Sequence, residues 1–422
     1  MNHKPIDIAI VGAGAAGLMT AIWAARTAGI KHTPLDVVLF DSRPKIGAKI
    51  LMSGGTRCNV TNKEVKPSDF HGGPSHFVKH VFEAFTPRET TQFFKAIGVE
   101  LILEPTGKYF PVTHSAQTVL DALIKETARA GVKLQTGTRV TEARKAKDLF
   151  YLKTENGNVI TAKKLILTTG GLSHPTTGSD GTGYGIARSF GHAVTNTFPA
   201  LTPLLTDDPD WKALSGIALP AKLSFFRNGK KECEYSDSFL FTHFGFSGPA
   251  ALDISRHFAS ASEEENPQIF ASFLPNYREE SLKGAFLALQ KKNPNKAIKN
   301  VLTDEFLLPT RFVEAFLKKI NIHINEPFVK CSADARKRLV HLLLNYPLEI
   351  TGVFGYKKAE VTAGGVDLKE IKAAAMESKL TDGLYFAGEI MDVDGRIGGF
   401  NFQWAWSTGA IAGRSVAKSL IS

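Results

Sequence analysis

The sequence has few of the features that stabilise secreted or membrane-embedded proteins. Its 422 residues include three cysteines, Cys58, Cys233 and Cys331, which lie far apart and form no C-x-x-C motif. We therefore expect neither a disulfide framework nor a bound metal such as zinc. No apolar run approaches the roughly 20 residues that a membrane-spanning helix needs. Residues 1–5 are too short and polar for a signal peptide, so a cytoplasmic protein without membrane contact is expected.

Repeats and low-complexity tracts are absent as well. A hydrophobic content of 43% is typical of globular proteins, and 422 residues exceed what a single small core accommodates. Two or three lobes are therefore expected.

A glycine-rich turn follows the first apolar run of the chain. Residues 6–11 predict a buried parallel strand, the motif Gly12–Gly17 (GAGAAG) follows at once, and residues 18–28 predict a helix. A second strand is predicted over residues 35–40 and ends at Asp41. Strand, G-x-G-x-x-G, helix, strand and acid together form the fingerprint of a dinucleotide-binding fold.

The residues of this fingerprint have distinct geometric roles. Gly12 makes the tight turn, Gly14 lets a pyrophosphate reach the backbone, and Gly17 lets the helix pack closely on the strand. The helix N-terminus favours the phosphate charge, and Asp41 can accept hydrogen bonds from the adenosine ribose. The predicted dinucleotide contacts are Gly12, Gly14, Ala15, Ala16, Gly17, Asp41 and Ser42.

The segment KILMSGGTRCNVTN, residues 49–62, lies just after this unit and is the most informative in the chain. The small residues at 53–55 expose backbone N–H groups to a phosphate or a flavin edge. Arg57 and Cys58 place a cation and a thiol beside them. The predicted cofactor contacts in this segment are Lys49, Gly54, Gly55, Arg57 and Asn59.

Later segments indicate FAD rather than a nicotinamide. The predicted strand at 163–167 runs into Thr-Gly-Gly, as does the second glycine-bearing strand of flavoproteins with two dinucleotide-binding folds. Residues 381–389 resemble the last FAD strand of such proteins, and a glycine pair precedes a predicted helix at 404–413. The N-terminus of that helix would stabilise the negative charge that reduction places on a flavin. The predicted FAD contacts here are Val140, Thr169, Gly170, Gly171, Gly388, Glu389, Asp392, Gly398, Gly399, Phe400 and Asn401.

The sequence patterns in the middle of the chain differ from the FAD-type segments on either side. The FAD-type segments predict one α/β domain over residues 1–197 and 351–422. Short alternating segments and an Asn228-Gly229 turn predict a β-barrel-like domain over 198–278 and 346–350. Helical periodicity predicts a helical insertion over 279–345. The helices expected there span residues 281–291, 297–306, 311–320 and 332–344.

This helical insertion is basic. Twelve lysines and arginines lie between Lys283 and Arg338, against five acids, in a chain with a formal net charge of +10. A basic module beside a flavin would favour a polyanionic substrate. An ordinary solvated helical surface accounts for the same composition, and no RNA-binding fold signature is present.

Six segments, in order along essentially the whole chain, resemble the bacterial BaiN/RdsA-type FAD-dependent oxidoreductases, also labelled aminoacetone oxidase-like or YhiN-like. These segments are KILMSGGTRCNVTN, LTTGGLSHPTTGSDGTGYGIARSFGH, FTHFGFSGPA, VTAGGVD, MESK and GLYFAGEIMDVDGRIGGFNFQWAWSTG. The resemblance implies a Rossmann-like FAD domain interrupted by a β-barrel that carries a helical insertion. The sequence departs from the pattern at Ala48 and Thr56, where a basic residue and a third glycine are expected. The Cβ of Thr56 is expected to disfavour a positive φ.

The resemblance implies more than one activity. One is reduction of a uridine in large-subunit ribosomal RNA to dihydrouridine, and bile-acid dehydroxylation and amine oxidation are others. We favour the RNA reaction, with ribosomal RNA and not DNA as partner, because the basic insertion suits a structured RNA. Hydride would pass from reduced FAD to C6 of an extruded uracil, and an acid would protonate C5. The alternatives are a small-molecule flavin oxidoreductase, which reduces an enone or oxidises an amine, and a FAD-stabilised assembly factor.

Two residues are the candidate proton donors. Cys58 is the first, because dihydrouridine synthases in general use a cysteine, although a small buried cysteine can equally pack beside the FAD. His243 is the second, because its ordinary pKa is suitable, although a core histidine bonded to backbone is the alternative. No second strand–G-x-G-x-x-G–helix unit exists. NADH or NADPH is therefore expected to reduce the flavin by transient docking, and the sequence does not predict the oligomeric state.

Overall fold

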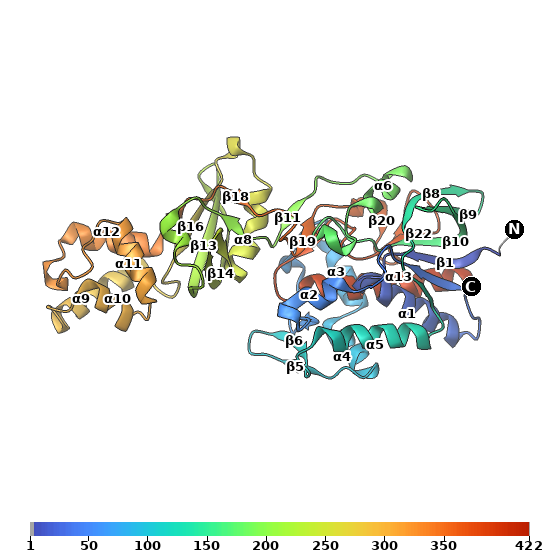
Figure 1. Cartoon of the computed structure of the whole chain (residues 1–422), viewed down its shortest axis with the longest axis horizontal. Coiled ribbons are helices and arrows are strands. Elements are labelled where there is room, and N and C mark those ends of the chain that lie inside the picture. Colours follow the sequence, from blue (N-terminus) through green and yellow to red (C-terminus); the bar gives the residue numbers. More distant parts are fainter. Residues whose placement is uncertain (1–3, 422) are drawn as a thin grey trace. The chain divides into compact units, whose positions relative to one another are not determined.

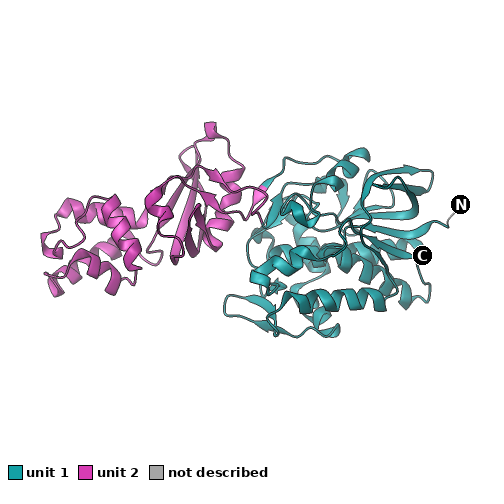
Figure 2. Cartoon of the chain, in the orientation of Figure 1, with its two compact units in different colours: residues 1–198, 360–422 teal, residues 199–359 magenta. Residues whose placement is uncertain are grey.

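The computed structural model describes residues 4–421, which form two compact units (Figure 2). Unit 1 contains the described residues up to Phe198 and from Glu360 onward, and unit 2 contains Pro199–Ala359. The insertion was predicted to end at residue 350. Unit 2 extends beyond that point because β18 (Gly352–Val353) pairs with β12 (Leu204–Leu205) inside it.

Unit 1 is built on a mixed sheet whose centre is parallel (Figure 1). Its strands follow the order β20 (Ile371–Lys372), β21 (Glu377–Ser378), β22 (Leu384–Phe386), β10 (Val159–Leu167), β1 (Ile6–Val11), β2 (Val37–Phe40) and β7 (Lys133–Gln135). The strands from β22 to β7 are parallel, and β8 (Val140–Ala146) and β9 (Leu149–Thr154) form an antiparallel meander that joins β10. This is the predicted α/β, Rossmann-like architecture.

Strand β1 is buried on both faces, as the central strand of a parallel sheet requires. Ile8 and Ile10 join the core on one face, which is covered by α1 (Ala15–Ile30), α5 (Ala116–Arg129) and α13 (Phe400–Ile421). Helix α13 lies close against α1, because Gly409 and Gly413 present no side chain to the α1 backbone. Ala9 and Val11, which alternate with the two isoleucines, join the core on the opposite face.

Shorter elements complete unit 1. They are α2 (Ala48–Thr56), β3 (Thr61–Asn62), β4 (Phe70–Gly72), α3 (Ser75–Ala84), α4 (Pro87–Ala96), β5 (Leu101–Leu103), β6 (Lys108–Pro111), α6 (Thr182–Ser189), β19 (Val361–Ala363) and β23 (Val393–Gly395). β11 (Phe198–Ala200) spans the boundary between the two units.

Unit 2 contains a seven-stranded antiparallel sheet. The order is β17 (Tyr346–Leu348), β16 (Gln268–Ser272), β13 (Ala218–Arg227), β14 (Lys230–Thr242), β15 (Gly245–Ser247), β12 and β18. The β13–β14 hairpin closes through Asn228 and Gly229, both with positive φ, which is the geometry of a type I′ turn. The edge strands β17 and β18 are consecutive in the chain, so the sheet must curl. Among residues 4–421 no pairing joins these two strands, and the predicted barrel is therefore an open, curled sheet.

The helices of unit 2 follow the predicted pattern. They are α7 (Pro209–Lys212), α8 (Pro249–Ala259), α9 (Glu279–Lys292), α10 (Ile298–Asp304), α11 (Thr310–Lys319) and α12 (Ala333–Leu344). The last four overlap the four helices predicted from periodicity. Phe225 and Phe241 of the sheet belong to the same hydrophobic cluster as Phe286 and Phe316 of the helices. The helical insertion therefore shares one core with the sheet. Within the described part of the chain, no helix has both the length and the apolar character needed to cross a membrane.

Candidate functional site

The glycine-rich segments of unit 1 meet at one edge of its sheet. Because β1, β2, β10 and β22 are parallel, their carboxyl ends lie at the same edge. β1 lies between β2 and β10, so the chain diverges on its two sides at this point, and such folds bind ligands beyond the strand ends at a switch point of this kind. The residues just beyond the four strand ends include Gly12–Gly17, Asp41, Thr169–Gly171 and Gly388–Glu389.

The turn between β1 and α1 is shaped by close backbone approach. A Cβ on Gly12, whose φ is +106°, would lie 2.5 Å from the Thr168 carbonyl oxygen, and one on Gly17 would lie 1.8 Å from the Gly12 oxygen. Gly14, the N-cap of α1, makes no side-chain cap, and a Cβ there would meet nothing within 4 Å. The first N–H groups of a helix have no partner within it. The start of α1, with Ala15 and Ala16, is thus an open site for an anion.

Asp41 ties the end of β2 to this turn. Its Oδ2 accepts a hydrogen bond from the Ala13 N–H at 2.8 Å, and its Oδ1 accepts one from the Arg43 N–H at 2.8 Å. Burial raises the pKa of Asp41, and these two N–H groups oppose the shift. The carboxylate oxygens of Asp41, next to Ser42, can also accept hydrogen bonds from a ligand hydroxyl.

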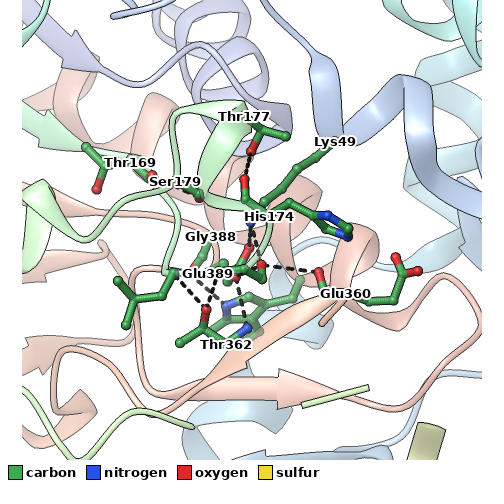
Figure 3. Close-up of polar contacts among 12 residues, drawn as sticks. Lys49, Thr169, His174, Thr177, Ser179, Glu360, Thr362, Gly388 and Glu389 are labelled. Carbon is green, nitrogen blue, oxygen red and sulfur yellow. Dashed lines mark hydrogen bonds and ion pairs between the residues drawn. The ribbon is translucent and has the colours of Figure 1, made fainter. Parts of the chain in front are cut away.

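A polar network joins four segments that are distant in the sequence (Figure 3). Lys49 Nζ lies 2.7 Å from Glu389 Oε2 and donates to Ser173 Oγ at 2.8 Å. Glu389 Oε1 accepts from Ser173 Oγ at 2.8 Å and from the Thr362 N–H at 3.0 Å. This network fixes α2, the loop after β10, β19 and the loop after β22 against one another.

Glu360 lies beside this network and was not among the predicted residues. Its carbonyl oxygen accepts from Ser173 Oγ at 3.4 Å, and its side chain is exposed. Crowding by protein around the carboxyl group removes hydration and raises its pKa; Lys49 opposes the shift and Glu389 adds to it. The one signal in the sequence is an acid placed directly before VTAGG. A carboxyl group that holds its proton at higher pH is suited to donating that proton.

Two buried polar atoms in unit 1 indicate that a ligand belongs here. Asn59 Oδ1 and Thr169 Oγ1 have no hydrogen-bond partner among residues 4–421. Leaving such a group unpaired costs about 1–3 kcal/mol. Both residues were predicted cofactor contacts, and Thr169 follows β10 at the sheet edge described above. A ligand rich in hydroxyls and ring heteroatoms, as FAD is, fits these unpaired atoms together with the open start of α1.

At the start of α13, backbone groups rather than side chains are available to a ligand. Gly398 and Gly399, with φ of 129° and 91°, directly precede Phe400, the first residue of the helix. The Asn401 side chain bonds both backbone groups of Gly395, at 2.8 and 2.9 Å. Asn401 was predicted to contact FAD, but its side chain is committed to this loop. Asp392, also predicted, accepts a hydrogen bond from the Gly73 N–H through its backbone oxygen.

Other predicted residues have partners of their own. Arg57 is ion-paired with Glu104 at 2.7 Å, and its guanidinium lies 4.0 Å from the Phe110 ring centroid, so its charge is already balanced. Val140, the first residue of β8, is buried and pairs with Thr154.

The expectation that Thr56 avoids a positive φ is wrong. Thr56 has φ 67° and continues a left-handed run through Gly54 (56°) and Gly55 (66°), which breaks α2. Its side chain is exposed, and its hydroxyl donates to the Gly55 oxygen. The turn therefore imposes the conformation on Thr56 in spite of its Cβ.

The two predicted proton donors belong to different units. Cys58 of unit 1 is 0% exposed within an apolar cluster, and burial raises the pKa of its thiol to about 12. His243 of unit 2 is exposed in the turn between β14 and β15, and its ring packs edge-on against Phe244. The catalytic roles of both residues stay predictions. No group of three or more His, Cys, Asp or Glu side chains among the described residues is arranged to hold a metal ion.

Comparison with known proteins places the chain in a family. The family model described as the HI0933-like protein Rossmann domain matches residues 6–415. The chain belongs to this family. A ribosomal RNA dihydrouridine synthase of Escherichia coli is 35% identical over 95% of this chain and 96% of its own length. A 3-dehydro-bile acid delta(4,6)-reductase of Clostridium scindens is 34% identical over 97% of this chain and 99% of its own.

A solved structure agrees on the fold. The quinol fumarate reductase of E. coli superimposes with a TM-score of 0.51 and 16% identity, over 99% of this chain and 71% of that chain. The resemblance to a BaiN/RdsA-type oxidoreductase and the Rossmann-like fold are thereby confirmed. One relative is named a reductase and the other a dihydrouridine synthase, so their names differ in substrate.

Proposed function

We propose that this chain is a FAD-dependent oxidoreductase that reduces a uridine of large-subunit ribosomal RNA to dihydrouridine. The observation that carries the cofactor assignment is the open N-terminus of α1 beyond β1, in the same unit as the unpaired Asn59 and Thr169 atoms. The substrate assignment rests on relatives of E. coli and Haemophilus influenzae, both named ribosomal RNA dihydrouridine synthase and matched along 95% or more of this chain.

Different residues at this edge of the sheet would bind different parts of FAD. The start of α1 would hold the pyrophosphate, and Asp41 the adenosine ribose. Lys49 and Glu389 would fix the loops around the remainder of the cofactor, with Asn59 and Thr169 supplying polar contacts. The N-terminus of α13 would face the flavin ring.

Reduction of a uracil ring requires a hydride at C6 and a proton at C5. Bound FAD supplies the hydride, and NADH or NADPH is the proposed transient reductant. We propose Glu360 as the group that holds the proton, because it lies beside the Lys49–Glu389 network and loss of hydration raises its pKa. Cys58 and His243 are the alternative donors. The uridine must leave its helical stack to reach such a site.

Reduction of a small molecule is the second candidate function. The relative of C. scindens is named as a reductase of a 3-dehydro-bile acid, and it matches this chain over a similar length and identity. An enone substrate would use the same FAD site and the same proton donor. It would not require any RNA-binding surface.

The decisive test is to delete the gene in its host and map dihydrouridine in large-subunit ribosomal RNA by mass spectrometry. We expect one dihydrouridine to disappear and to return with the wild-type gene but not with a Glu360→Gln form. Purified protein with NADH or NADPH should form the same product on an unmodified transcript. Unchanged RNA, together with flavin reoxidation by small enones, would overturn the RNA assignment and support the second candidate.

A further inference from the structure

The lysines of the helical insertion fall into two classes. Five lysines form ion pairs with acids of unit 2, at α9–α11 and at α7. The pairs are Lys283–Glu279, Lys296 with Asp304 and Glu305, Lys299–Glu314, Lys318–Asp210, and Lys319 with Asp208 and Asp210. These lysines are balanced within the protein and leave little charge for a partner.

A second set of lysines has no such balance. Lys291, Lys292, Lys330 and Lys337 are all exposed, and none forms an ion pair within residues 4–421. They lie at the end of α9, in the 3-10 turn Phe328–Lys330, and in α12.

A hydrogen-bond network holds these three segments together. Gln290 Nε2 donates to the Phe328 carbonyl oxygen at 2.9 Å, and Arg336 Nη1 donates to Gln290 Oε1 at 3.1 Å. The Val329 N–H donates to the Pro294 carbonyl at 2.9 Å. Each unpaired lysine is within two positions of a residue in this network. We call residues 290–292 and 328–338 together the cationic surface.

The composition of the cationic surface separates it from an ordinary solvated face. It contains six lysines and arginines and one acid, Asp334, whose place in the first turn of α12 suits the helix dipole. Surfaces that only need solubility intersperse both signs of charge. Lys291 and Lys292 stabilise the end of α9, but Lys330 and Lys337 lie at no α-helix C-terminus. Unpaired cations held on three fixed segments are suited to a polyanion with regularly spaced charges.

We propose that the cationic surface binds the phosphate backbone of the RNA substrate. This inference rests on the proposed function and adds the place where RNA docks. Phosphate contacts fix position without reading sequence, and they release counterions, so their contribution falls with salt. The paired lysines of the same insertion do not take part.

The test compares two variants that each lose four positive charges. The surface variant carries Lys291→Gln, Lys292→Gln, Lys330→Gln and Lys337→Gln. The control variant carries Lys283→Gln, Lys296→Gln, Lys299→Gln and Lys318→Gln. Both are prepared as full-length, FAD-loaded protein, and flavin absorbance and thermal unfolding establish that they fold. Binding to an unmodified large-subunit ribosomal RNA transcript is measured between 50 and 200 mM KCl.

We expect the surface variant to bind about tenfold or more weakly, and its slope of log affinity against log salt to fall by about three, because each phosphate contact contributes about 0.7–0.9. The control variant should stay within about threefold of wild type, because its lysines are already balanced. Equal weakening in both variants would overturn the proposal in favour of net charge. Tighter binding of poly-glutamate than of RNA would overturn it in favour of an acidic protein partner.

The outcomes separate this inference from the proposed function. If wild-type protein binds and modifies the transcript and the surface variant does so equally well, RNA docks elsewhere and only this inference fails. If wild-type protein neither binds nor modifies the transcript, the proposed function fails and the inference with it.

Discussion

The core of unit 2 and the strand ends of unit 1 achieve close packing with different residues. In unit 2 large aromatic rings pack against one another: Trp211 stacks on Phe312 with centroids 6.0 Å apart, and Phe239 stacks on Phe246 at 5.0 Å. At the strand ends of unit 1, backbone meets backbone, with no room for a Cβ between Gly17 and Gly12. The difference teaches where a ligand can bind. Aromatic packing covers the backbone, whereas glycine turns leave N–H groups uncovered, and the unpaired Asn59 and Thr169 atoms also belong to unit 1.

The largest test of this comparison removes an aromatic anchor of unit 2. Trp211 is 1% exposed, so Trp211→Ala should cost about 3–5 kcal/mol of unfolding free energy. Unit 2 should then unfold at a lower temperature than the unit that retains FAD. Near-UV circular dichroism and flavin fluorescence would follow the two events, and Trp211→Phe should have a smaller effect. Simultaneous loss of both signals would show that the units unfold as one.

Removing the proposed acid, Glu360, tests whether the chemistry occurs in unit 1. It should stop turnover without unfolding this unit. Glu360→Gln should lower turnover about 100-fold or more at unchanged FAD content. Because the donor must be protonated, wild-type turnover should fall as pH rises through the raised pKa of Glu360, and the variant should lose that dependence. Cys58→Ala is the matched comparison and should retain turnover. The opposite ranking of the two variants would restore Cys58 as the donor.

A Cβ added at the close contact between Gly17 and Gly12 should destabilise unit 1 and not unit 2. Gly17→Ala should cost about 1–3 kcal/mol, because the new Cβ would clash with the Gly12 carbonyl group, which is backbone and cannot rotate away. FAD content should fall with it. Gly29→Ala lies in the same helix with open space around its Cβ, and should be neutral or stabilising by about 0.5–1 kcal/mol. Thermal unfolding of the FAD-loaded proteins would measure both, and equal effects would contradict the packing role of Gly17.

A smaller effect is expected where unit 1 forces a side chain into a glycine conformation. Thr56→Gly should raise the unfolding free energy by about 1 kcal/mol, because it removes the Cβ at φ 67°. Thr56→Ala keeps the Cβ and should gain much less. Chemical denaturation would resolve the two variants. A destabilised Thr56→Gly would mean that the threonine makes a contact worth more than the strain.

The smallest effect concerns a buried histidine of unit 1. His192 is bonded to Glu370 at 3.0 Å and to Ser378 at 2.8 Å; burial lowers its pKa and Glu370 opposes the shift. The folded state therefore favours neutral imidazole. Its contribution to stability should be complete above the ordinary value of 6.5 and should decline as pH falls toward the folded pKa. His192→Gln should flatten this part of the stability profile between pH 5 and 8, as measured by denaturation.

Much of the fold could be predicted because its signals are local. Gly12, Gly17 and Asp41 lie close together in the sequence, and each role follows from backbone geometry at that point. Asn228-Gly229 predicted its hairpin for the same reason, since few other pairs accept two positive φ values. The helices of the insertion were predicted from apolar periodicity.

The partners of side chains could not be predicted in this way. Lys49 and Glu389 were each expected near FAD, but they are 340 positions apart and their ion pair depends on the folded sheet. Arg57 pairs with Glu104, and Asn401 with Gly395, through tertiary contacts that no local pattern indicates. Glu360 was missed because an acid before a glycine segment has no distinctive spacing. Thr56 shows the reverse case. Its Cβ disfavours a positive φ, as the sequence predicted, but the turn at Gly54 and Gly55 imposes one.

The insertion of unit 2 also affects how the protein is made. Strand β22 and helix α13, which complete the sheet and cover α1, are encoded after the whole of unit 2. A ribosome that translates this chain therefore releases unit 2 as a continuous, foldable segment while the first part of unit 1 still lacks its neighbours. The nascent protein must protect the exposed side of β10 until β22 has been synthesised. Chain termination after unit 2 but before β22 would thus leave a complete insertion attached to a domain that lacks part of its sheet.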